Sequence, residues 1–220
     1  MAQNDRIKLT TPKGVAIWPS LNTPDTKFNA AGKYGTRLAF DGAEPLVQAF
    51  QARLEKIRDD FYDTEVERLK ADKKAGLAAE LTKAPVLKPE RDPETGLETG
   101  RLIYSASMTA SGVSKKTGKP WTMSPDLFDA KGTKLKNPPA IYGGSEMKLS
   151  VEVDAFVNQT SKQVMVSARL NAAQIIKLVS GGNRDSSDYG FAEEDGDEIA
   201  DQAPATGGFA DETGTGDDDI

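Results

Sequence analysis

The sequence predicts a mainly β fold, a small antiparallel barrel with a long helical insertion, followed by a disordered acidic C-terminal tail. Period-two apolar alternation dominates both ends of the first 184 residues, and a period of three to four residues replaces it in between. Past residue 184 the chain carries acids without a single base. We therefore expect a folded body at residues 1–184 and a disordered tail at residues 185–220.

The first strands are expected at residues 6–10, 14–18 and 33–40, where apolar and polar residues alternate. In the second of these segments, the alternation puts Val15 and Ile17 together on one face. These three segments predict the first two or three strands of the barrel.

A helical insertion is expected at about residues 44–84. Pro45 suits a first helical turn, Gly76 is expected to interrupt the helix, and Pro85 ends it. Residues 85–100 contain further prolines and glycines and predict a loop. The apolar residues that define the helical period are Leu46, Phe50, Leu54, Ile57 and Phe61.

Strands return after Gly100. Residues 101–110, 119–129, 146–157 and 162–170 all alternate, and the third segment keeps six apolar residues on one face. The turn between the last two segments predicts a hairpin. Residue Asn171 is then expected to cap a short helix over 172–180, ending at Gly181 and Gly182.

The composition excludes several classes of site. The chain has no His and no Cys, so it cannot carry a His/Cys zinc site, a Cys nucleophile, a Ser-His-Asp triad or a disulfide. It has no run of eighteen apolar residues, and residues 1–14 lack an apolar signal core. We expect a cytosolic protein that needs no cofactor and does not span a membrane.

Charge is divided unevenly along the chain. The whole sequence has 28 basic and 34 acidic residues, a net charge of −6. Residues 185–220 hold 13 of the acids and no base, so residues 1–184 hold 28 bases against 21 acids, a net charge of +7. A basic body joined to an acidic tail favours nucleic-acid binding by the first and protein interaction by the second.

Two lysine-rich loops with aromatic neighbours are the strongest candidates for DNA binding. Lysines in such loops can neutralise phosphates, and a nearby ring can stack on an unpaired base, which is how single strands are bound without sequence preference. The alternative is that the lysines only solubilise the loops while Trp121 fills the core. The residues concerned are Lys115, Lys116, Lys119 and Trp121 in the first loop, and Lys131, Lys134, Lys136 and Tyr142 in the second.

Further candidates lie on predicted strand faces. Lys33 and Arg37 share one face of their strand, and Phe156 lies opposite the apolar stripe of its own strand, among polar residues. Trp18 lies opposite Val15 and Ile17 and is a candidate for lining a surface groove. A solvated strand face, or ordinary packing of Trp18, predicts the same residues.

One enzymatic pattern competes with these candidates. Asp126, which follows Pro125, precedes Glu146 and Lys148 by about twenty residues, as in the PD-(D/E)xK signature of magnesium-dependent nucleases. In such a site two carboxylates hold the metal and the lysine positions the attacking water. The pattern is degenerate, and no βαβ core surrounds it.

The order of elements, the basic body, the segment "VSARLNAAQIIKL" and the acidic ending "GDDDI" together resemble phage-encoded single-stranded DNA-binding proteins. The resemblance implies an OB-fold barrel, a groove for single-stranded DNA, and a tail that recruits replication proteins. It also implies a place in phage DNA replication or recombination, in the cytoplasm of the infected bacterial host. The tail residues expected to bind a partner are Phe209, Asp217, Asp218, Asp219 and Ile220.

The sequence therefore favours a binding protein without enzymatic activity. A magnesium-dependent nuclease is one alternative, and a DNA-mimic or chaperone-like protein whose tail is the functional part is another. The sequence leaves open whether the chain forms a homo-oligomer.

Overall fold

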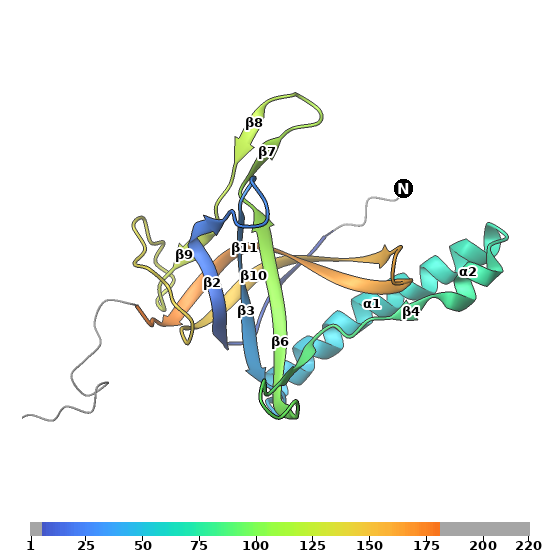
Figure 1. Cartoon of the computed structure of the whole chain (residues 1–220), viewed down its shortest axis with the longest axis horizontal. Helices are drawn as coiled ribbons and strands as arrows, with labels where there is room; N and C mark the ends of the chain where they lie inside the picture. The colour runs from blue at the N-terminus through green and yellow to red at the C-terminus, as the bar shows by residue number, and fades with distance from the viewer. Residues whose placement is uncertain (1–5, 181–220) are drawn as a thin grey trace, which may run out of the picture. The chain divides into compact units, whose positions relative to one another are not determined.

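The chain forms one long sheet that curls into a ring, crossed at one side by a long helix (Figure 1). The structure is a computed structural model that describes residues 6–180. The acidic tail expected at residues 185–220 lies outside the described residues. The elements, in chain order, are β1 (Ile7–Thr10), β2 (Gly14–Asp25), β3 (Lys33–Asp41), α1 (Pro45–Ala71), α2 (Ala75–Glu80), β4 (Thr82–Lys83), β5 (Lys88–Arg91), β6 (Glu98–Thr109), β7 (Ser111–Val113), β8 (Pro120–Thr122), β9 (Asp126–Phe128), β10 (Glu146–Asn158) and β11 (Gln163–Lys177).

Five strands close the ring in the order β2-β3-β6-β11-β10, with β10 returning to β2. All the pairings in the ring are antiparallel except that of β6 with β11, where Arg169 pairs with Ser107 in parallel. A five-stranded Greek-key barrel is the OB architecture. The chain therefore has an OB-like fold, as predicted.

The apolar stripe of β10 supplies the centre of the core, as its alternation predicts. Met147, Leu149, Val151 and Val153 are fully buried, while the intervening residues face outward. Leu38 and Phe40 of β3 and Leu170 of β11 meet them inside the barrel. The alternation with a period of two thus arises because each strand has one face in the core and the other in solvent.

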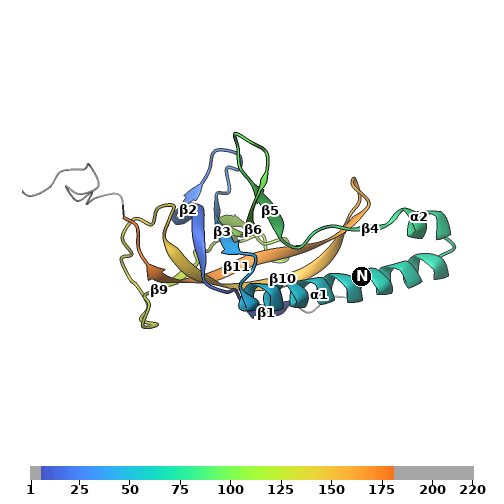
Figure 2. The ribbon, with the colours of Figure 1, turned by 90° about the horizontal axis from the view of Figure 1, so that it is seen from below.

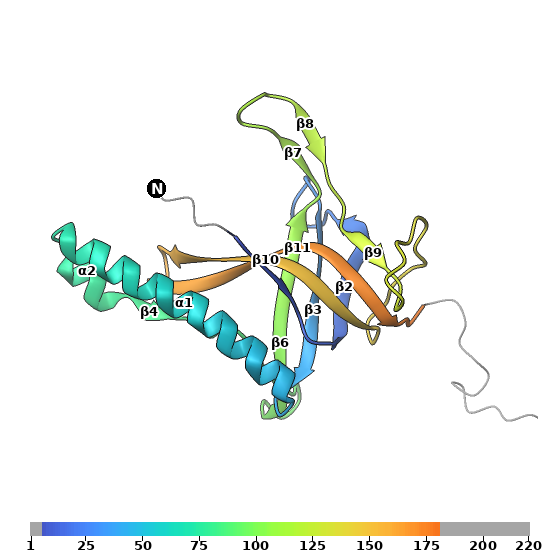
Figure 3. The same cartoon turned by 180° about the vertical axis from the view of Figure 1, so that it is seen from behind.

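The predicted helical insertion is confirmed. Pro45 occupies the first turn of α1, where its missing N–H costs no hydrogen bond. The first half of α1 buries Val47, Phe50 and Leu54 in the barrel core, and its second half packs against the β10–β11 hairpin (Figure 3). The break between α1 and α2 falls at residues 72–74, just before the predicted position at Gly76.

The short helix predicted at residues 172–180 is wrong, because β11 continues to Lys177. Val151 pairs with Leu170 and Ser150 pairs with Ala172, so Asn171 is the extra residue of a β-bulge. Because of the bulge, the residues that face the core after Leu170 are Ala173 and Ile175, three and five positions further along the chain. Apolar residues three apart therefore imitate a helical period inside a strand.

Two other segments differ from the prediction. The loop expected at 85–100 contains β5 and the start of β6, which form a hairpin whose turn is fixed by Asp92 accepting the N–H groups of Glu94 and Thr95. The single strand expected at 119–129 is divided in two. β8 pairs only with β7, whereas β9 pairs with β11.

The face assignment of β2 is also reversed. Ala16 pairs with the fully buried Leu38 and is itself buried, so Val15 and Ile17 lie on the outside of the barrel. Because the inward residue at position 16 is small, a pattern based on large apolar residues assigns the wrong face of β2 to the core. Within residues 6–180, neither helix is long and apolar enough to cross a bilayer.

Candidate nucleic-acid interface

The outer surface of β3 and β6 is the candidate interface. In OB barrels, oligonucleotides bind across the second and third barrel strands and the loops beside them, and these strands are β3 and β6 here. Lys33, Gly35 and Arg37 point outward from β3 and pair with Thr109, Ser107 and Ser105 of β6. We call this surface, with the adjoining loop 26–32 and the β7–β8 hairpin, the β3–β6 face.

A groove of about 380 Å³ runs over this face. Gly35 forms part of its floor. A side chain at this position would not fit, because its Cβ would lie 2.9 Å from Ser107 Cβ. Lys33 and Arg37 stand on either side, about 13 Å apart at the rise of an extended strand. The groove is lined by Trp18, Ser20, Asp25, Lys33, Gly35, Thr36, Arg37, Ser105, Ala106 and Ser107.

Trp18 forms one wall of this groove, as the sequence suggested, although for a different reason. Its backbone has a φ of 50°, and the β2–β3 register shifts between Ile17 and Ser20. This irregularity, rather than strand parity, turns the indole outward. Trp18 is 82% exposed, so its ring is available for stacking.

The loop 26–32 adds a second exposed ring. Phe28 is 87% exposed, and Lys27 Nζ lies 5.4 Å from the centroid of its ring. Backbone and side-chain hydrogen bonds tie this loop to the base of the β7–β8 hairpin: the Ala110 N–H donates to Gly32 O and Ser111 Oγ donates to Ala31 O. The loop and the hairpin are therefore held side by side.

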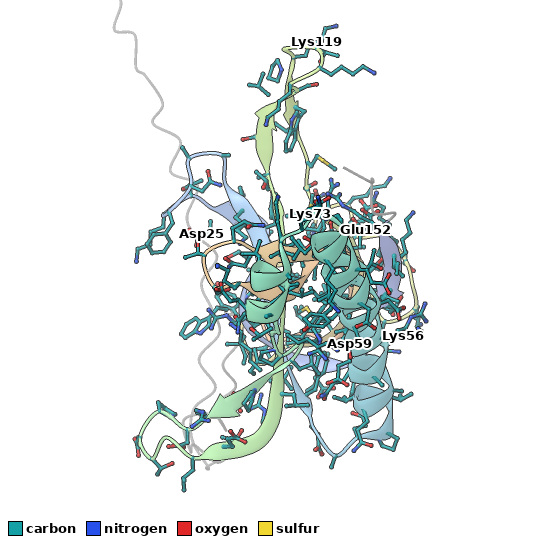
Figure 4. The ribbon with its side chains drawn as sticks, turned by 90° about the vertical axis from the view of Figure 1, so that its right-hand side faces the viewer. Asp25, Lys56, Asp59, Lys73, Lys119 and Glu152 are labelled. Atoms are coloured by element: carbon teal, nitrogen blue, oxygen red, sulfur yellow. The ribbon has the colours of Figure 1, made fainter. Side chains whose placement is uncertain are left out.

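The β7–β8 hairpin carries the first lysine loop. Lys115, Lys116 and Lys119 surround its tip, and Figure 4 shows Lys119 at the end far from the barrel. Trp121 lies on β8, 36% exposed and packed on Gly112 of β7. Trp121 is therefore not a core residue, which removes the packing alternative for this ring.

The cations of this face are unpaired within residues 6–180. The ion pairs of that part of the chain engage other basic residues, such as Lys13 with Glu146 and Lys134 with Asp126. Arg169 adds a cation beside Ser107, with Nη2 at 3.4 Å from Met123 Sδ. The face can therefore attract phosphates without first breaking a salt bridge.

The second lysine loop lies elsewhere on the barrel. Residues 129–142 run from β9 along the end of β11 and past β2, where Asn22 Nδ2 donates to the carbonyls of Pro138 and Pro139. Tyr142 is 48% exposed, and its N–H donates to Val179 O. The expected arrangement of two lysine loops around one strand is wrong, because that strand is interrupted between β8 and β9.

Within this second loop, Lys134 Nζ lies 2.7 Å from Asp126 Oδ1. The Thr133 and Lys131 N–H groups donate to the Asp129 carboxylate and hold its pKa below the ordinary value. Lys131 and Lys136 are both exposed and form no ion pair within residues 6–180.

Phe156 lies away from the groove. It pairs with Met165 in the β10–β11 hairpin, four residues along β11 from the point where Arg169 meets β6. Glu152 and Asp154 share its face and lie 3.7 and 4.0 Å from the guanidinium of Arg6. Phe156 is 40% exposed, but its surroundings are acidic.

The proposed nuclease site does not assemble. Asp126 is level with Ala172 on one edge of β11, and Glu146 is level with Lys177 on the other edge, about 15 Å along the strand. Lys13 donates to Glu146 at 2.7 Å and holds the pKa of that carboxyl below its ordinary value. Residues 6–180 contain no cluster of three or more His, Cys, Asp or Glu residues able to hold a metal ion.

Sequence reasoning missed three residues of the face: Phe28, Met123 and Arg169. Phe28 could have been found as an aromatic residue beside Lys27 in an otherwise polar turn between two strands. Arg169 could be placed on the polar side of its strand, but its position next to β6 depends on the parallel pairing that closes the barrel. That pairing has no local sequence signal.

Similarity to known proteins agrees with this geometry. Residues 14–178 match the family described as "Single-stranded DNA-binding protein, Bacteriophage T7". The single-stranded DNA-binding protein of Enterobacteria phage T3 is 24% identical over 169 residues, covering 76% of this chain and 72% of its own. That of Escherichia phage T7 is 25% identical over 159 residues, covering 71% and 67%.

Among solved structures, the crystal structure of gp2.5, a single-stranded DNA-binding protein encoded by bacteriophage T7, superposes with a TM-score of 0.65. The match covers 89% of this chain and 100% of that chain at 20% identity, and it shows a shared fold.

Proposed function

Because the chain belongs to the family of single-stranded DNA-binding proteins represented by that of bacteriophage T7, we propose that it binds single-stranded DNA across the β3–β6 face. The observation that carries this proposal is the pair of cations, Lys33 and Arg37, that form no ion pair within residues 6–180 and lie along a groove walled by Trp18. Cations that track a backbone and rings that stack on bases are the two requirements for sequence-tolerant binding of single strands.

Each part of the face has a separate role in this proposal. Lys33 and Arg37 neutralise phosphates in the groove, and Trp18 and Phe28 stack on bases at its edge. Lys115, Lys116 and Lys119 hold the strand as it passes the hairpin, with Trp121 as a third ring. The flat floor at Gly35 lets the backbone of the DNA approach the sheet.

Binding of this kind involves no chemical step, and we assign the protein no enzymatic activity. We place it in phage DNA replication or recombination, in the cytoplasm of the infected host, because unpaired strands arise there as intermediates. Lys131, Lys136, Tyr142 and Phe156 remain predicted DNA contacts that only a path longer than the groove would reach.

The acidic segment 185–220 has two proposed roles. It recruits replication or recombination proteins through apolar residues set among acids, and it competes with DNA for the basic body. A flexible chain of this length spans about 35 Å, which is enough to reach a basic surface on the same molecule. The residues proposed to contact a partner are Phe209, Asp217, Asp218, Asp219 and Ile220.

Titration of the full chain against labelled single-stranded and duplex oligonucleotides, with and without magnesium, tests the proposal. We expect intact single strands to be retarded in both conditions. Shortened DNA in magnesium would support a nuclease instead, and no retardation of single strands would contradict DNA binding.

A matched pair of variants locates the site. The double variant Lys33→Gln/Arg37→Gln should bind single strands much more weakly than the wild type. Lys70→Gln/Lys74→Gln removes the same charge near the end of α1, on exposed positions away from the groove, and should bind nearly as well as the wild type. Equal losses in the two variants would mean that net charge, and not this face, sets the affinity.

A further inference from the structure

A second groove, of about 650 Å³, lies between β1 and the first turns of α1 (Figure 2). It shares no residue with the groove on the β3–β6 face. We call it the β1–α1 groove. Its lining residues are Lys8, Leu9, Thr10, Thr11, Pro12 and Lys13 from β1 and the turn after it, Glu44, Leu46, Ala49, Phe50 and Arg53 at α1, and Lys148 and Ile176 from β10 and β11.

One side of the groove is the open edge of β1. In the described part of the chain, β1 pairs with β10 alone. The Thr11 N–H donates to Leu149 O at 2.9 Å, and main-chain groups alternate in direction along a strand, so those of Lys8 and Thr10 point away from β10. Lys8 and Thr10 both line the groove. Their N–H and C=O groups can therefore pair with an extended chain that is added as a further strand.

The two faces of β1 differ in polarity. Leu9 is buried on the core side, and Ile7 shares its face. Lys8 is exposed on the opposite, outer face, where Lys148 of β10 also lies. A strand added beside β1 continues both faces and places alternate side chains on each. Such a strand meets apolar residues on one face and lysines on the other.

The floor of the β1–α1 groove is apolar. Leu46 and Phe50 are four residues apart and therefore share one face of α1. Phe50 is 7% exposed, whereas Leu46 is 65% exposed. Ala49 and Ile176 add to the apolar lining. A leucine that is this exposed beside an apolar floor favours a partner with aliphatic side chains.

The rim of the groove is basic. Lys8, Arg53 and Lys148 are exposed and form no ion pair within residues 6–180. Glu152 pairs with Lys8 in the β1–β10 ladder, but its carboxylate lies 3.7 Å from the guanidinium of Arg6. The rim therefore favours a partner that carries negative charge.

Two other occupants fit the groove less well. The lining has no exposed aromatic ring on which the bases of single-stranded DNA could stack, and an apolar floor does not favour phosphates. A second copy of the chain, paired β1 to β1 about a two-fold axis, would place the two basic rims against each other. Charge and polarity together favour an acidic peptide.

We propose that the β1–α1 groove docks an extended acidic segment of another protein, added as a strand beside β1. In this segment acids alternate with aliphatic residues. The acids lie near the rim lysines and Arg53, and the aliphatic side chains cover Leu46 and Phe50. Main-chain hydrogen bonds to Lys8 and Thr10 fix the register. The proposal does not rest on DNA binding by the β3–β6 face.

A defined peptide tests the proposal on the full chain. The probe is a fluorescein-labelled peptide of the sequence Glu-Val-Glu-Leu-Glu-Val-Glu, and fluorescence anisotropy measures its binding. We expect saturable binding. Replacing every Glu of the peptide by Gln, or every aliphatic residue by Ser, should weaken binding several-fold, because the first change removes the charge and the second removes the apolar contacts.

Two N-methylated forms of the peptide test strand addition. One form carries the methyl groups on the backbone nitrogens of its Glu residues, and the other carries them on those of its aliphatic residues. Only one edge of an added strand pairs with β1, so one form should lose binding and the other should retain it. Equal affinities of the two forms would contradict strand addition.

Matched variants of the protein locate the site. Lys8→Glu/Arg53→Glu should weaken peptide binding several-fold, while Lys70→Glu/Lys74→Glu, with the same change in net charge at exposed positions near the end of α1, should leave it nearly unchanged. Single-strand affinity measured on the same variants reports the β3–β6 face separately, and the two double variants should change it alike.

A second pair of variants tests the apolar floor. Leu46→Ser should weaken peptide binding, and Leu97→Ser, at a similarly exposed leucine between β5 and β6, should not. Three results would overturn the proposal. They are a peptide affinity that ignores the charges of the rim, displacement of the peptide by single-stranded DNA that depends on Lys8 and Arg53, and peptide binding that appears only after residues 185–220 are removed.

Discussion

Gly112 and Trp121 face each other across the β7–β8 hairpin, and the indole occupies the space that a side chain at position 112 would fill. A Cβ on Gly112 would lie 2.6 Å from Trp121 Cζ2 and 2.9 Å from Cε2. The ring is therefore packed on the backbone of β7 while 36% of the residue stays exposed. This contact holds the indole ring in place on a hairpin that lies outside the barrel.

The substitution Gly112→Ala should move the indole without removing it. Because the new methyl group would overlap the ring, Trp121 must shift. Loss of a stacking ring typically costs about 1–3 kcal/mol of single-strand affinity, and the loss in Gly112→Ala should be smaller because the ring is still present. Fluorescence titration with an oligonucleotide measures the change. The control is Gly76→Ala, where no atom lies within 4 Å of the new Cβ, and unchanged affinity in Gly112→Ala would show that the position of Trp121 is irrelevant.

Removal of the ring itself separates binding from stability. Trp121→Ala should cost about 1–3 kcal/mol of single-strand affinity. Its unfolding free energy should change far less than the about 3–5 kcal/mol lost when a core tryptophan is truncated, because Trp121 is partly exposed on a two-stranded hairpin. Thermal melting and the same titration give both values. A large fall in melting temperature with unchanged affinity would assign Trp121 to packing.

The salt dependence of single-strand affinity should report the number of phosphates that the β3–β6 face neutralises. The logarithm of affinity should fall with the logarithm of salt concentration at about −0.7 per phosphate, so four to six contacts give a slope of roughly −3 to −4. Lys33→Gln should make the slope shallower by about 0.7. Oligonucleotides of different sequence should give similar slopes and affinities. A flat response, or a strong preference for one sequence, would contradict this model.

Tyr104 offers a test of the core. Its hydroxyl is buried with no hydrogen-bond partner in the described residues, and its ring meets Phe50 edge-on at 5.2 Å. Burial raises the pKa of the phenol, so the hydroxyl stays protonated and neutral over the working range of pH. An unsatisfied buried hydroxyl is unfavourable, so Tyr104→Phe should leave the unfolding free energy unchanged or raise it by about 1 kcal/mol.

Urea denaturation measures this change, with Tyr62→Phe as the matched control. Tyr62 Oη donates to Leu81 O at 3.2 Å, so its removal should lower stability by about 1 kcal/mol. A marked loss of stability in Tyr104→Phe would reveal a partner for this hydroxyl.

The parts of the fold that follow from local periodicity could be predicted from the sequence. The stripe of β10 and the face shared by Lys33 and Arg37 both appear where period two predicts them, because one side of each strand is dry. The bulge at Asn171 could not be predicted, since its cause is the register with β10 rather than any local preference. The face of β2 that points into the core was also not predictable, because its inward residue Ala16 is small. A small residue can fill a core position as well as a large one where its neighbours occupy the remaining space.

The candidate site was predicted in part for the same reason. Lys33, Arg37 and the lysines near Trp121 come together because β3 and β6 are neighbours in the barrel, and because the β7–β8 hairpin follows β6 and is hydrogen-bonded at its base to the loop before β3. The loop with Lys131 and Lys136 is close in sequence but is carried elsewhere by the pairing of β9 with β11. Closure of the barrel, which brings distant segments together, decides which lysines share a face.

Removal of residues 185–220 should tighten DNA binding at low salt. The deletion turns a net charge of −6 into +7, because the segment holds 13 acids and no base. If the segment competes with DNA for the basic body, as proposed, DNA must displace a tethered polyanion from the intact chain. Screening shortens the Debye length from about 8 Å near physiological ionic strength to about 3 Å at 1 M, so the gain should fade as salt rises.

The measurement is a titration of the full-length and shortened chains against one fluorescent oligonucleotide at several salt concentrations. Equal affinities of full-length and shortened chains in low salt would exclude self-competition, because a polyanion that contacts the DNA face must cost affinity when salt does not screen it.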